Sequence, residues 1–386
     1  MHLSKEEVLN NVFEHSQAKL DFYKNYLYKY VSILLNDKHT DKIDIYDIFC
    51  GIGIYDDGNY GSPIIAIQII QDLKAKFPQK EITLIINDKD SNKVNFVTEY
   101  ISKNYKDACK LQSYNLDALE MITIVKDCIL KSNQKTKSLV FIDPYGYKNI
   151  YKKDICDIMS KKSSEIILFL PIAQMYRFIN GALEDDKNKS YSHLRRFINE
   201  FFNQNHPVVT AKLESQLQYI QYIKDAFTCN KNDYSASYSI QRNNSTYYAL
   251  FFITNHIYGL DRIVDTKWKL DNNCGEGFTK NDVQHLFTDL FEESKQNDCL
   301  GNLREQLIMF LSEYKTNNEI YEFVLKLGFL PKQASDILKI LDKEKLLIYN
   351  VEIKNRYFYI GWKYFKSNDI KYSAKIKKVL NSDNSQ

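Results

Sequence analysis

The chain has 386 residues, of which 44% are hydrophobic and 26% are charged, as is ordinary for a globular protein of two to three domains. Its formal net charge of +3 is too small to indicate nucleic-acid binding by itself. No run approaches the roughly 18 apolar residues that cross a bilayer, and residues 1–18 contain no apolar signal-peptide core. We therefore expect a cytoplasmic protein with no membrane partner.

The seven cysteines stand singly, without a Cys-x-x-Cys pair or a nearby His-x-x-x-His motif. This spacing favours reduced structural thiols over a zinc site or a disulfide framework. We expect no metal. The cysteines are at positions 50, 109, 128, 156, 229, 274 and 299.

Apolar residues recur at three- and four-residue spacing from Ser4 to Leu35, which predicts helices. Three lysines, Lys19, Lys24 and Lys29, are interpreted as the solvated face of these helices. A role in binding substrate is the alternative.

The apolar run Ile43 to Phe49 predicts a strand that ends close to two glycines, Gly51 and Gly53. Glycine permits a positive φ and removes Cβ atoms that would keep a ligand from the backbone. A third glycine at the spacing of a dinucleotide fingerprint is missing. The pattern Asp-x-Phe-x-Gly-x-Gly, which begins at Asp47 and includes Phe49, instead looks like the first motif of S-adenosylmethionine-dependent methyltransferases. A plain tight turn is the alternative.

Strand and helix patterns then alternate. Pro63 to Lys76 is predicted as a helix with Ser62 as its N-cap. A second strand, Glu81 to Ile86, is followed by Asp88, whose carboxylate can accept hydrogen bonds from two ribose hydroxyls. Asp90 is the alternative for that role, and a helix-capping turn is the structural alternative.

A short strand from Leu111 to Tyr114 leads to Asp117. In methyltransferases a polar residue at this place contacts the adenine amino group. Asp117 is therefore a candidate cofactor contact, with helix capping as the alternative.

The fourth strand, Leu139 to Ile142, runs into Asp143, Pro144 and Tyr145. In amino-methyltransferases an acid or amide and the proline carbonyl accept hydrogen bonds from an exocyclic amine, while an aromatic ring stacks on the base. Tyr145 or Tyr147 can supply that ring. The motif is closer to the Asp-Pro-Phe-Gly of tRNA guanine-N2 methyltransferases than to Asp-Pro-Pro-Tyr. A turn without chemistry is the alternative.

A fifth strand, Glu165 to Leu170, precedes a predicted hairpin formed by Ser237 to Gln241 and Thr246 to Thr254. Five parallel strands followed by an antiparallel hairpin are the arrangement of the class I methyltransferase fold. The helical insertion at 172–232 is expected to overhang the ligand edge of the sheet as a substrate cap.

Three segments together resemble the three-Cys-motif partner protein family: Asp47 to Pro63, Phe141 to Gly146 and Tyr247 to His256. The resemblance implies a bacterial methyltransferase-like protein that is typically the partner of a three-cysteine-motif protein. It supplies no proven reaction or substrate.

Nine residues, Ile54 to Ser62, separate the glycine turn from the next helix and can form a lid. Asp57, with Asp56, is a candidate for orienting a substrate amine or binding a divalent cation, and a solvated loop carboxylate is the alternative. His256, just after the last strand, is a weaker candidate for proton transfer.

Three predicted helices and two strands near the C-terminus match a winged helix. The second strand is expected at Arg356 to Trp362, and a lysine-rich tail follows. A phosphate-bearing partner is favoured over protein docking. The predicted helices are Leu303 to Tyr314, Asn318 to Leu327 and Lys332 to Lys345, and the first strand is Leu346 to Val351.

We therefore expect an α/β protein with a Rossmann-like class I methyltransferase sheet, a helical insertion and a C-terminal winged-helix domain. The expected cofactor is S-adenosylmethionine, and the expected partner is RNA or DNA methylated at an exocyclic amine. The alternative is a non-catalytic nucleic-acid- or protein-binding partner of a three-Cys-motif protein. The expected domains are N-terminal helices at 1–40, an α/β domain at 41–298, a winged helix at 299–365 and a basic tail at 366–386.

Overall fold

The structure is a computed structural model that describes residues 14–77, 79–210, 213–243, 246–279, 289–351 and 358–377. The chain divides into two compact units, one of residues 1–270 with 276–285 and one of residues 271–275 with 286–386. Among the described residues no helix combines the length and the apolar character that crossing a membrane requires.

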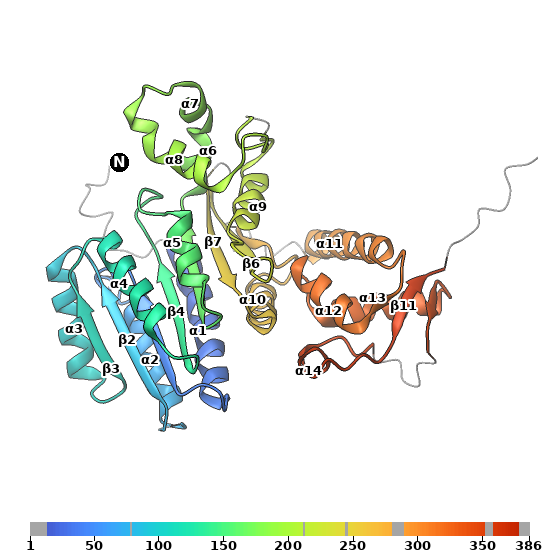
Figure 1. Cartoon of the computed structure of the whole chain (residues 1–386), viewed down its shortest axis with the longest axis horizontal. Helices are drawn as coiled ribbons and strands as arrows, with labels where there is room; N and C mark the ends of the chain where they lie inside the picture. Colours follow the sequence, from blue (N-terminus) through green and yellow to red (C-terminus); the bar gives the residue numbers. More distant parts are fainter. Residues whose placement is uncertain are drawn as a thin grey trace, which may run out of the picture. The chain divides into compact units, whose positions relative to one another are not determined.

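The first unit is built on an eight-stranded sheet with the order β3-β2-β1-β4-β5-β7-β6-β8 (Figure 1). The first five strands are parallel, β7 is antiparallel to β5, and β6 pairs with β7 as a hairpin. This is the predicted class I methyltransferase arrangement, to which β8 adds an unpredicted parallel strand beside β6. The strands are β1 (Lys42–Asp47), β2 (Glu81–Asn87), β3 (Lys110–Tyr114), β4 (Thr136–Ile142), β5 (Ser164–Leu170), β6 (Tyr234–Asn243), β7 (Thr246–Thr254) and β8 (Gly277–Thr279).

Helices cover the sheet, which explains why its central strands are apolar on both faces. The first helix belongs to this core, because Phe22 and Tyr23 stack on Phe252 of β7 and Phe141 of β4 at centroid distances of 4.5 and 4.4 Å. Residues 4–13 of that predicted helix lie outside the described residues. The helices are α1 (Glu14–Asn36), α2 (Ser62–Lys74), α3 (Ser91–Asn104), α4 (Ala118–Lys131), α5 (Lys152–Met159) and α10 (Ile257–Leu270).

One helix start differs from the prediction. Ser62 is the first residue of α2, and Gly61 occupies the N-cap position without a side-chain cap. The amide of Gly61 donates to the carbonyl of Gly53 at 2.7 Å, so the chain folds back on the glycine turn before the helix begins.

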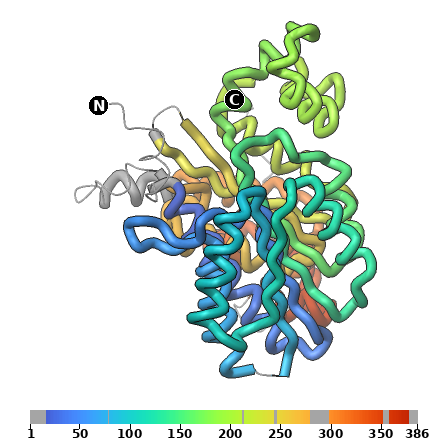
Figure 2. Tube along the Cα trace, turned by 90° about the vertical axis from the view of Figure 1, so that its left-hand side faces the viewer, coloured from blue at the N-terminus to red at the C-terminus, as the bar shows by residue number. Residues whose placement is uncertain are grey.

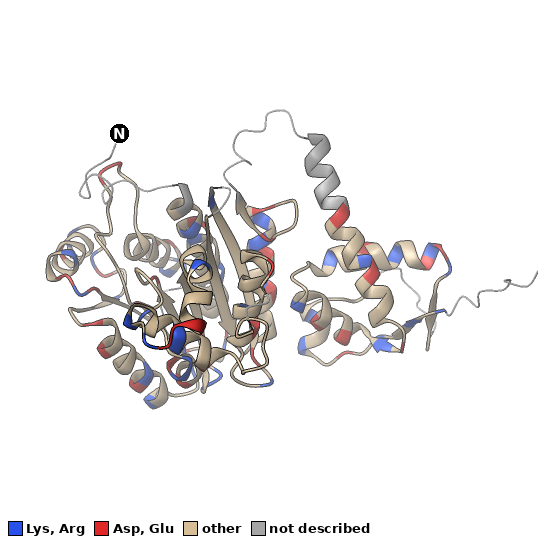
Figure 3. Cartoon of the chain, turned by 90° about the horizontal axis from the view of Figure 1, so that it is seen from above, with Lys and Arg blue, Asp and Glu red and all other residues tan. Residues whose placement is uncertain are grey.

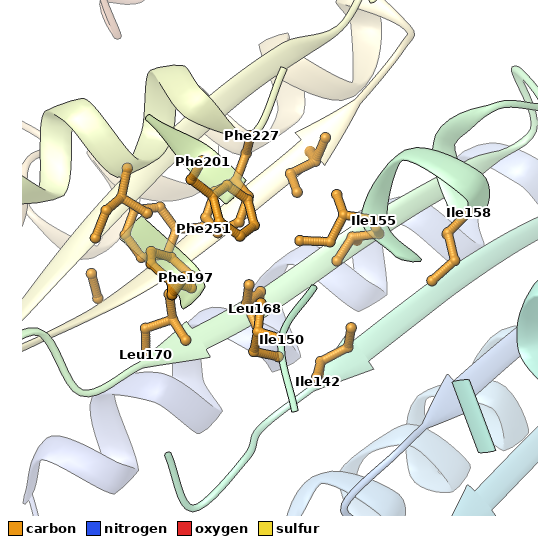
Figure 4. Packing of buried hydrophobic residues seen from close by; sticks show 14 of the residues in the cluster. Ile142, Ile150, Ile155, Ile158, Leu168, Leu170, Phe197, Phe201, Phe227 and Phe251 are labelled. Carbon is orange, nitrogen blue, oxygen red and sulfur yellow. The ribbon is translucent and has the colours of Figure 1, made fainter. Parts of the chain in front are cut away.

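The predicted helical insertion follows the carboxyl end of β5, and Figures 1 and 2 show α7 and α8 beyond that end of the sheet. Its core is continuous with that of the sheet (Figure 4). The ring centroid of Phe227 lies 5.3 Å from that of Phe201 in α8 and 5.2 Å from that of Phe251 in β7. The insertion comprises α6 (Ile172–Arg177), α7 (Ile179–Glu184), a 3-10 turn (Lys189–Tyr191), α8 (Ser192–Phe201) and α9 (Gln216–Ala226).

Two disulfides correct the expectation that the cysteines are reduced. Cys156 of α5 pairs with Cys229 after α9, with Cα atoms 5.4 Å apart, and Cys274 pairs with Cys299 at 6.0 Å. The partners are 73 and 25 residues apart in the sequence, so no local motif marks them. Tertiary packing alone brings the thiols together.

The second unit is a winged helix made of α11 (Asp289–Phe310), α12 (Asn317–Lys326), α13 (Pro331–Lys343) and a three-stranded sheet of order β10-β11-β9. β10 (Leu347–Tyr349) and β9 (Lys315–Thr316) both pair with β11 (Ser373–Ile376). The helix α11 runs without interruption through residues 298 and 299, where a domain boundary was expected.

The predicted second wing strand was wrong for the residues that the structure describes. Residues 358–361 are irregular, and a short helix, α14 (Trp362–Lys366), follows. The strand is instead β11, which lies in the expected basic tail at 366–386; Tyr372 and Ala374 of this segment are buried in the core of the unit. Lys375 of the same strand lies 4.5 Å from the ring centroid of Tyr314.

Candidate functional site

The glycine turn after β1 has the conformation that the sequence predicted. Gly51 and Gly53 have φ values of +60° and +70°, which disfavour other residues. A Cβ on Gly53 would lie 2.8 Å from Cγ2 of Val97, so this glycine lets α3 pack against the turn. A Cβ on Gly51 would meet no atom within 4 Å, so open space adjoins the backbone there.

The acid after β2 holds the glycine turn. Oδ2 of Asp88 accepts a hydrogen bond from the Gly51 amide at 3.1 Å, and Oδ1 accepts one from the Asp90 amide at 3.0 Å. Asp90 in turn caps α3. The structure therefore brings Asp88 to the predicted edge of the sheet, next to the turn, and gives Asp90 a capping role.

A neighbouring amide positions three loops, a role that sequence reasoning missed. The side-chain amide of Asn87 donates to the carbonyls of Ile48 at 3.1 Å and Leu116 at 3.2 Å, and its oxygen accepts from the Leu116 amide at 3.0 Å. These bonds join the ends of β1, β2 and β3. Asn87 is the last residue of β2, and an amide side chain at the end of an apolar run was the available signal in the sequence.

Asp47, the last residue of β1, is completely buried, and among the described residues neither carboxyl oxygen has a partner with full hydrogen-bond geometry; the Ser62 hydroxyl and the Phe49 amide are the nearest donors. The pKa of this carboxyl is raised to about 7, mainly by burial and also by the carboxylates of Asp143 and Asp88, while the Ser62 hydroxyl and the Phe49 amide act to lower it. A buried acid without a fully formed hydrogen bond is costly. Asp47 therefore stays a predicted contact for a ligand group that donates hydrogen bonds.

Phe49 follows Asp47 into the turn and is half-buried against the core of the first unit. This packing helps fix the chain between β1 and Gly51. The structure thus assigns Phe49 a role in shaping the turn.

Asp143 directly follows β4, two residues after Phe141, which pairs with Asp47 of β1. Its carboxylate forms an ion pair with Lys19 of α1. The Lys19 ammonium donates to Oδ2 of Asp143 and lies 4.8 Å from the ring centroid of Phe169 on β5. Only 12% of the Lys19 side chain is exposed, so its interpretation as a solvated lysine was wrong.

The other two lysines of α1 lie elsewhere. Lys24 is exposed, and Lys29 donates to Asp265 of α10 at 2.6 Å. Lys19 alone of the three reaches Asp143 because the face of α1 that carries it packs against the sheet.

Pro144 and Tyr145 leave the sheet beside Asp143. Pro144 is buried, and within the described part of the chain its carbonyl accepts no hydrogen bond. Tyr145 is 78% exposed, and its hydroxyl accepts a hydrogen bond from Lys93 of α3 at 3.0 Å. A free carbonyl, an acid and an accessible ring therefore share this edge of the sheet.

The expected lid is a small closed hairpin, in which Ile54 pairs with Tyr60. Tyr55, which sequence reasoning missed, is close enough to the site to interact with it: burial and then the charge of Asp143 raise the pKa of Tyr55 to about 12. Asp57 is exposed at the hairpin tip, where Oδ1 accepts from the Asn59 amide at 3.0 Å and shapes the turn.

Asp117 lies at the N-terminus of α4 as a helix cap. Its Oδ1 accepts from the Leu119 amide at 3.1 Å, and Glu120 accepts from the Asp117 amide at 3.2 Å. His256 is on the opposite edge of the sheet, because Thr254 pairs with the amino end of β5, so it is separate from the other candidates.

Residues 278–351 match a family described as the GMT-like wHTH domain. No curated protein matches the chain. Among solved structures, the O-methyltransferase from Bacillus cereus in complex with SAH is 10% identical over 60% of this chain and 80% of its own, with a TM-score of 0.31. The SAM-dependent methyltransferase from Agrobacterium tumefaciens is 9% identical over 63% and 62%, with a TM-score of 0.32. These scores are too low to support an argument, so the fold assignment rests on the strand order.

Proposed function

We propose that this chain transfers a methyl group from S-adenosylmethionine to an exocyclic amine of a base in RNA or DNA. The observation that supports the proposal most is the carboxyl of Asp47, which is buried without a fully formed hydrogen bond at the end of β1, four residues before Gly51 and on the same sheet edge as Asp143. Buried acids with raised pKa values are concentrated at functional sites.

The residues on the donor side fit the cofactor. Asp47, at the end of β1, is our candidate for accepting a hydrogen bond from an ammonium or another donor group of the cofactor. Asp88 uses one lone pair of each oxygen for a backbone amide, which leaves lone pairs for two ribose hydroxyls. Gly51 leaves room for close approach to the backbone. Asp117 remains our candidate for the adenine amino group.

The residues on the acceptor side fit an amine. Lys19 occupies Oδ2 of Asp143, so Oδ1 and the Pro144 carbonyl remain as acceptors for two N–H groups. Tyr145 presents an exposed ring on which a base can stack. When bound, S-adenosylmethionine supplies an already activated methyl group. The chain therefore has to orient the amine and exclude water.

The winged helix supports nucleic acid as the partner. Its third helix, α13, presents Lys332 to solvent, whereas Lys339 is paired with Asp336 at 2.7 Å. Because acids are interspersed with the lysines and arginines of this unit (Figure 3), the choice of nucleic acid rests on the type of fold and not on a basic patch. The family match to a wHTH domain is the second support for this choice.

A second candidate function is a non-catalytic binding partner of a three-Cys-motif protein. The pair between Lys19 and Asp143 favours it, because an ammonium already occupies one oxygen of the proposed amine acceptor. In this candidate function the pocket is a scaffold or a ligand sensor.

Transfer of radiolabelled methyl groups into total RNA and total DNA tests the proposal. We expect the Asp143→Ala variant to lose incorporation while it retains the fold and donor binding. The matched control is Asp154→Ala, because Asp154 forms a similar half-buried pair with Lys126 at 2.6 Å. Equal incorporation by wild type and Asp143→Ala contradicts the catalytic role.

A further inference from the structure

The helix α3 carries a row of exposed and partly exposed side chains beside the candidate site. Lys93, Phe96 and Tyr100 are spaced by three and four residues, so they lie along one flank of the helix. A different face, which includes Val94 and Val97, packs against the sheet. The flank is therefore not needed for the core.

The row continues at both ends onto neighbouring loops. Near the acceptor side, the Lys93 ammonium donates to the Tyr145 hydroxyl and lies 5.6 Å from the centroid of its ring. At the other end, partial burial and a side-chain hydrogen bond with Tyr60 raise the pKa of Tyr100. We call these five residues the aromatic stripe.

Three of the four rings of the aromatic stripe are largely accessible, and the fourth, Tyr100, is partly exposed. Tyr145 is 78% exposed, Phe96 is 50% exposed and Tyr60 is 37% exposed. In the described part of residues 14–279, Tyr28 is the one other aromatic side chain that is largely exposed. Exposed aromatic rings gathered in one place indicate a surface that binds a ligand.

We infer that the aromatic stripe binds the single-stranded nucleic acid that flanks the acceptor base. This inference rests on the proposed function and names the form of its substrate. Bases of a single strand can stack on exposed rings, whereas a duplex hides their faces. The stripe contains no aliphatic side chain, and Lys93 supplies a positive charge for phosphate.

The dimensions also fit a strand. Phe96 and Tyr100 are four residues apart on α3, which corresponds to a rise of about 6 Å. Stacked nucleotides of one strand are about 3.4 Å apart, so these rings span about two bases. The stripe begins at Tyr145, two residues after Asp143, and therefore leads directly to the proposed acceptor site.

Fluorescence anisotropy on the full chain tests the inference, with labelled single-stranded RNA and DNA and the matching duplexes as probes. Phe96→Ala and Tyr60→Ala remove rings, and Lys93→Ala removes the charge. Tyr28→Ala, on α1 and 47% exposed, is the matched ring control, and Lys103→Ala, at the far end of α3, is the charge control. Any binding by the winged helix is common to all these variants.

We expect each ring variant to lose about tenfold in affinity for a single strand, the usual effect of removing one stacked base contact, while duplex affinity is unchanged. The inference is overturned if Phe96→Ala and Tyr60→Ala lose no more single-strand affinity than Tyr28→Ala does. It is also overturned if the wild type binds no single strand. Either result favours a protein partner for this surface. A calorimetric titration with S-adenosylmethionine distinguishes failure of this inference from failure of the proposed function. If the chain binds the donor but the ring variants bind single strands as well as the wild type does, only the inference about the aromatic stripe is refuted. If the chain does not bind the donor, the proposed function is refuted.

Discussion

Lys19 of α1 donates a hydrogen bond to Asp143 at the end of β4, although 124 residues separate the two in the sequence. The pair ties the first helix to the proposed acceptor site and fixes which oxygen of Asp143 remains available. Because the pair is only partly exposed, it is better shielded from solvent than an ordinary surface pair. The N-terminal helix is thus part of the candidate site.

Replacing Lys19 by methionine is expected to lower the rate of methyl transfer about tenfold or more, because Asp143 loses the contact that orients it. The affinity for S-adenosylmethionine should stay the same, and Lys19→Arg should restore part of the rate. Steady-state kinetics with donor titration measure both quantities. Lys126→Met, which breaks the comparable pair with Asp154, is the control. An equal loss in both methionine variants would show that Lys19 acts only through stability.

Asp47 makes stability depend on pH. Its pKa of about 7 in the folded chain exceeds the ordinary value of 3.8, so the folded chain holds a proton that the unfolded chain releases between about pH 4 and pH 7. The free energy of unfolding therefore decreases as the pH rises through this window, by up to about 4 kcal/mol in total. About 3 kcal/mol of this decrease is expected between pH 5 and pH 8.

The Asp47→Asn variant should not show this loss. Urea unfolding at pH 5 and pH 8 measures it, and Asp72→Asn, at an exposed position of α2, is the control. A parallel pH dependence in wild type and Asp47→Asn would contradict the burial of Asp47 without a fully formed hydrogen bond.

The two glycines of the turn should respond differently to substitution by alanine. Gly53→Ala places a Cβ 2.8 Å from Val97 at positive φ, so we expect a loss of about 3 kcal/mol in unfolding free energy. Gly51→Ala meets open space and should cost only about 1 kcal/mol. It should nevertheless abolish donor binding, because its methyl group enters the space proposed for the donor. Chemical unfolding and calorimetry test the pair, and normal donor binding by Gly51→Ala would place the donor elsewhere.

Asp117 has a capping role that can be separated from a cofactor contact. Serine caps helices about as well as aspartate, so Asp117→Ser should keep the unfolding free energy within about 0.5 kcal/mol, whereas Asp117→Ala should lose about 1 kcal/mol. If Asp117 contacts adenine, the serine variant should bind S-adenosylmethionine about tenfold more weakly. Unchanged affinity in this variant would leave capping as the role of Asp117.

The sheet was predictable because its strands and turns are locally encoded. The apolar runs of β1, β4 and β5 and the glycines at 51 and 53 follow from side-chain burial and backbone sterics, and both recur in the structure. The edge position of Asp88 and Asp143 follows from parallel strand order alone.

The missed features depend on packing between distant segments. Nothing local distinguishes Lys19 from Lys24, since the difference arises from the face of α1 that meets the sheet. Cys156 and Cys229 meet only because α5 and the end of the insertion are neighbours in the fold. The wing strand Ser373–Ile376 lies in a lysine-rich segment, and only the burial of Ala374 and Tyr372 shows that it folds back.

The most direct measurement is a calorimetric titration of the purified chain with S-adenosylmethionine and its demethylated product, alongside the Asp88→Ala variant. We predict micromolar binding to the wild type that is lost in the variant, because Asp88 holds the glycine turn and faces the proposed ribose position. Well-folded wild-type protein that binds neither compound would contradict the proposed donor site and favour the non-catalytic binding partner.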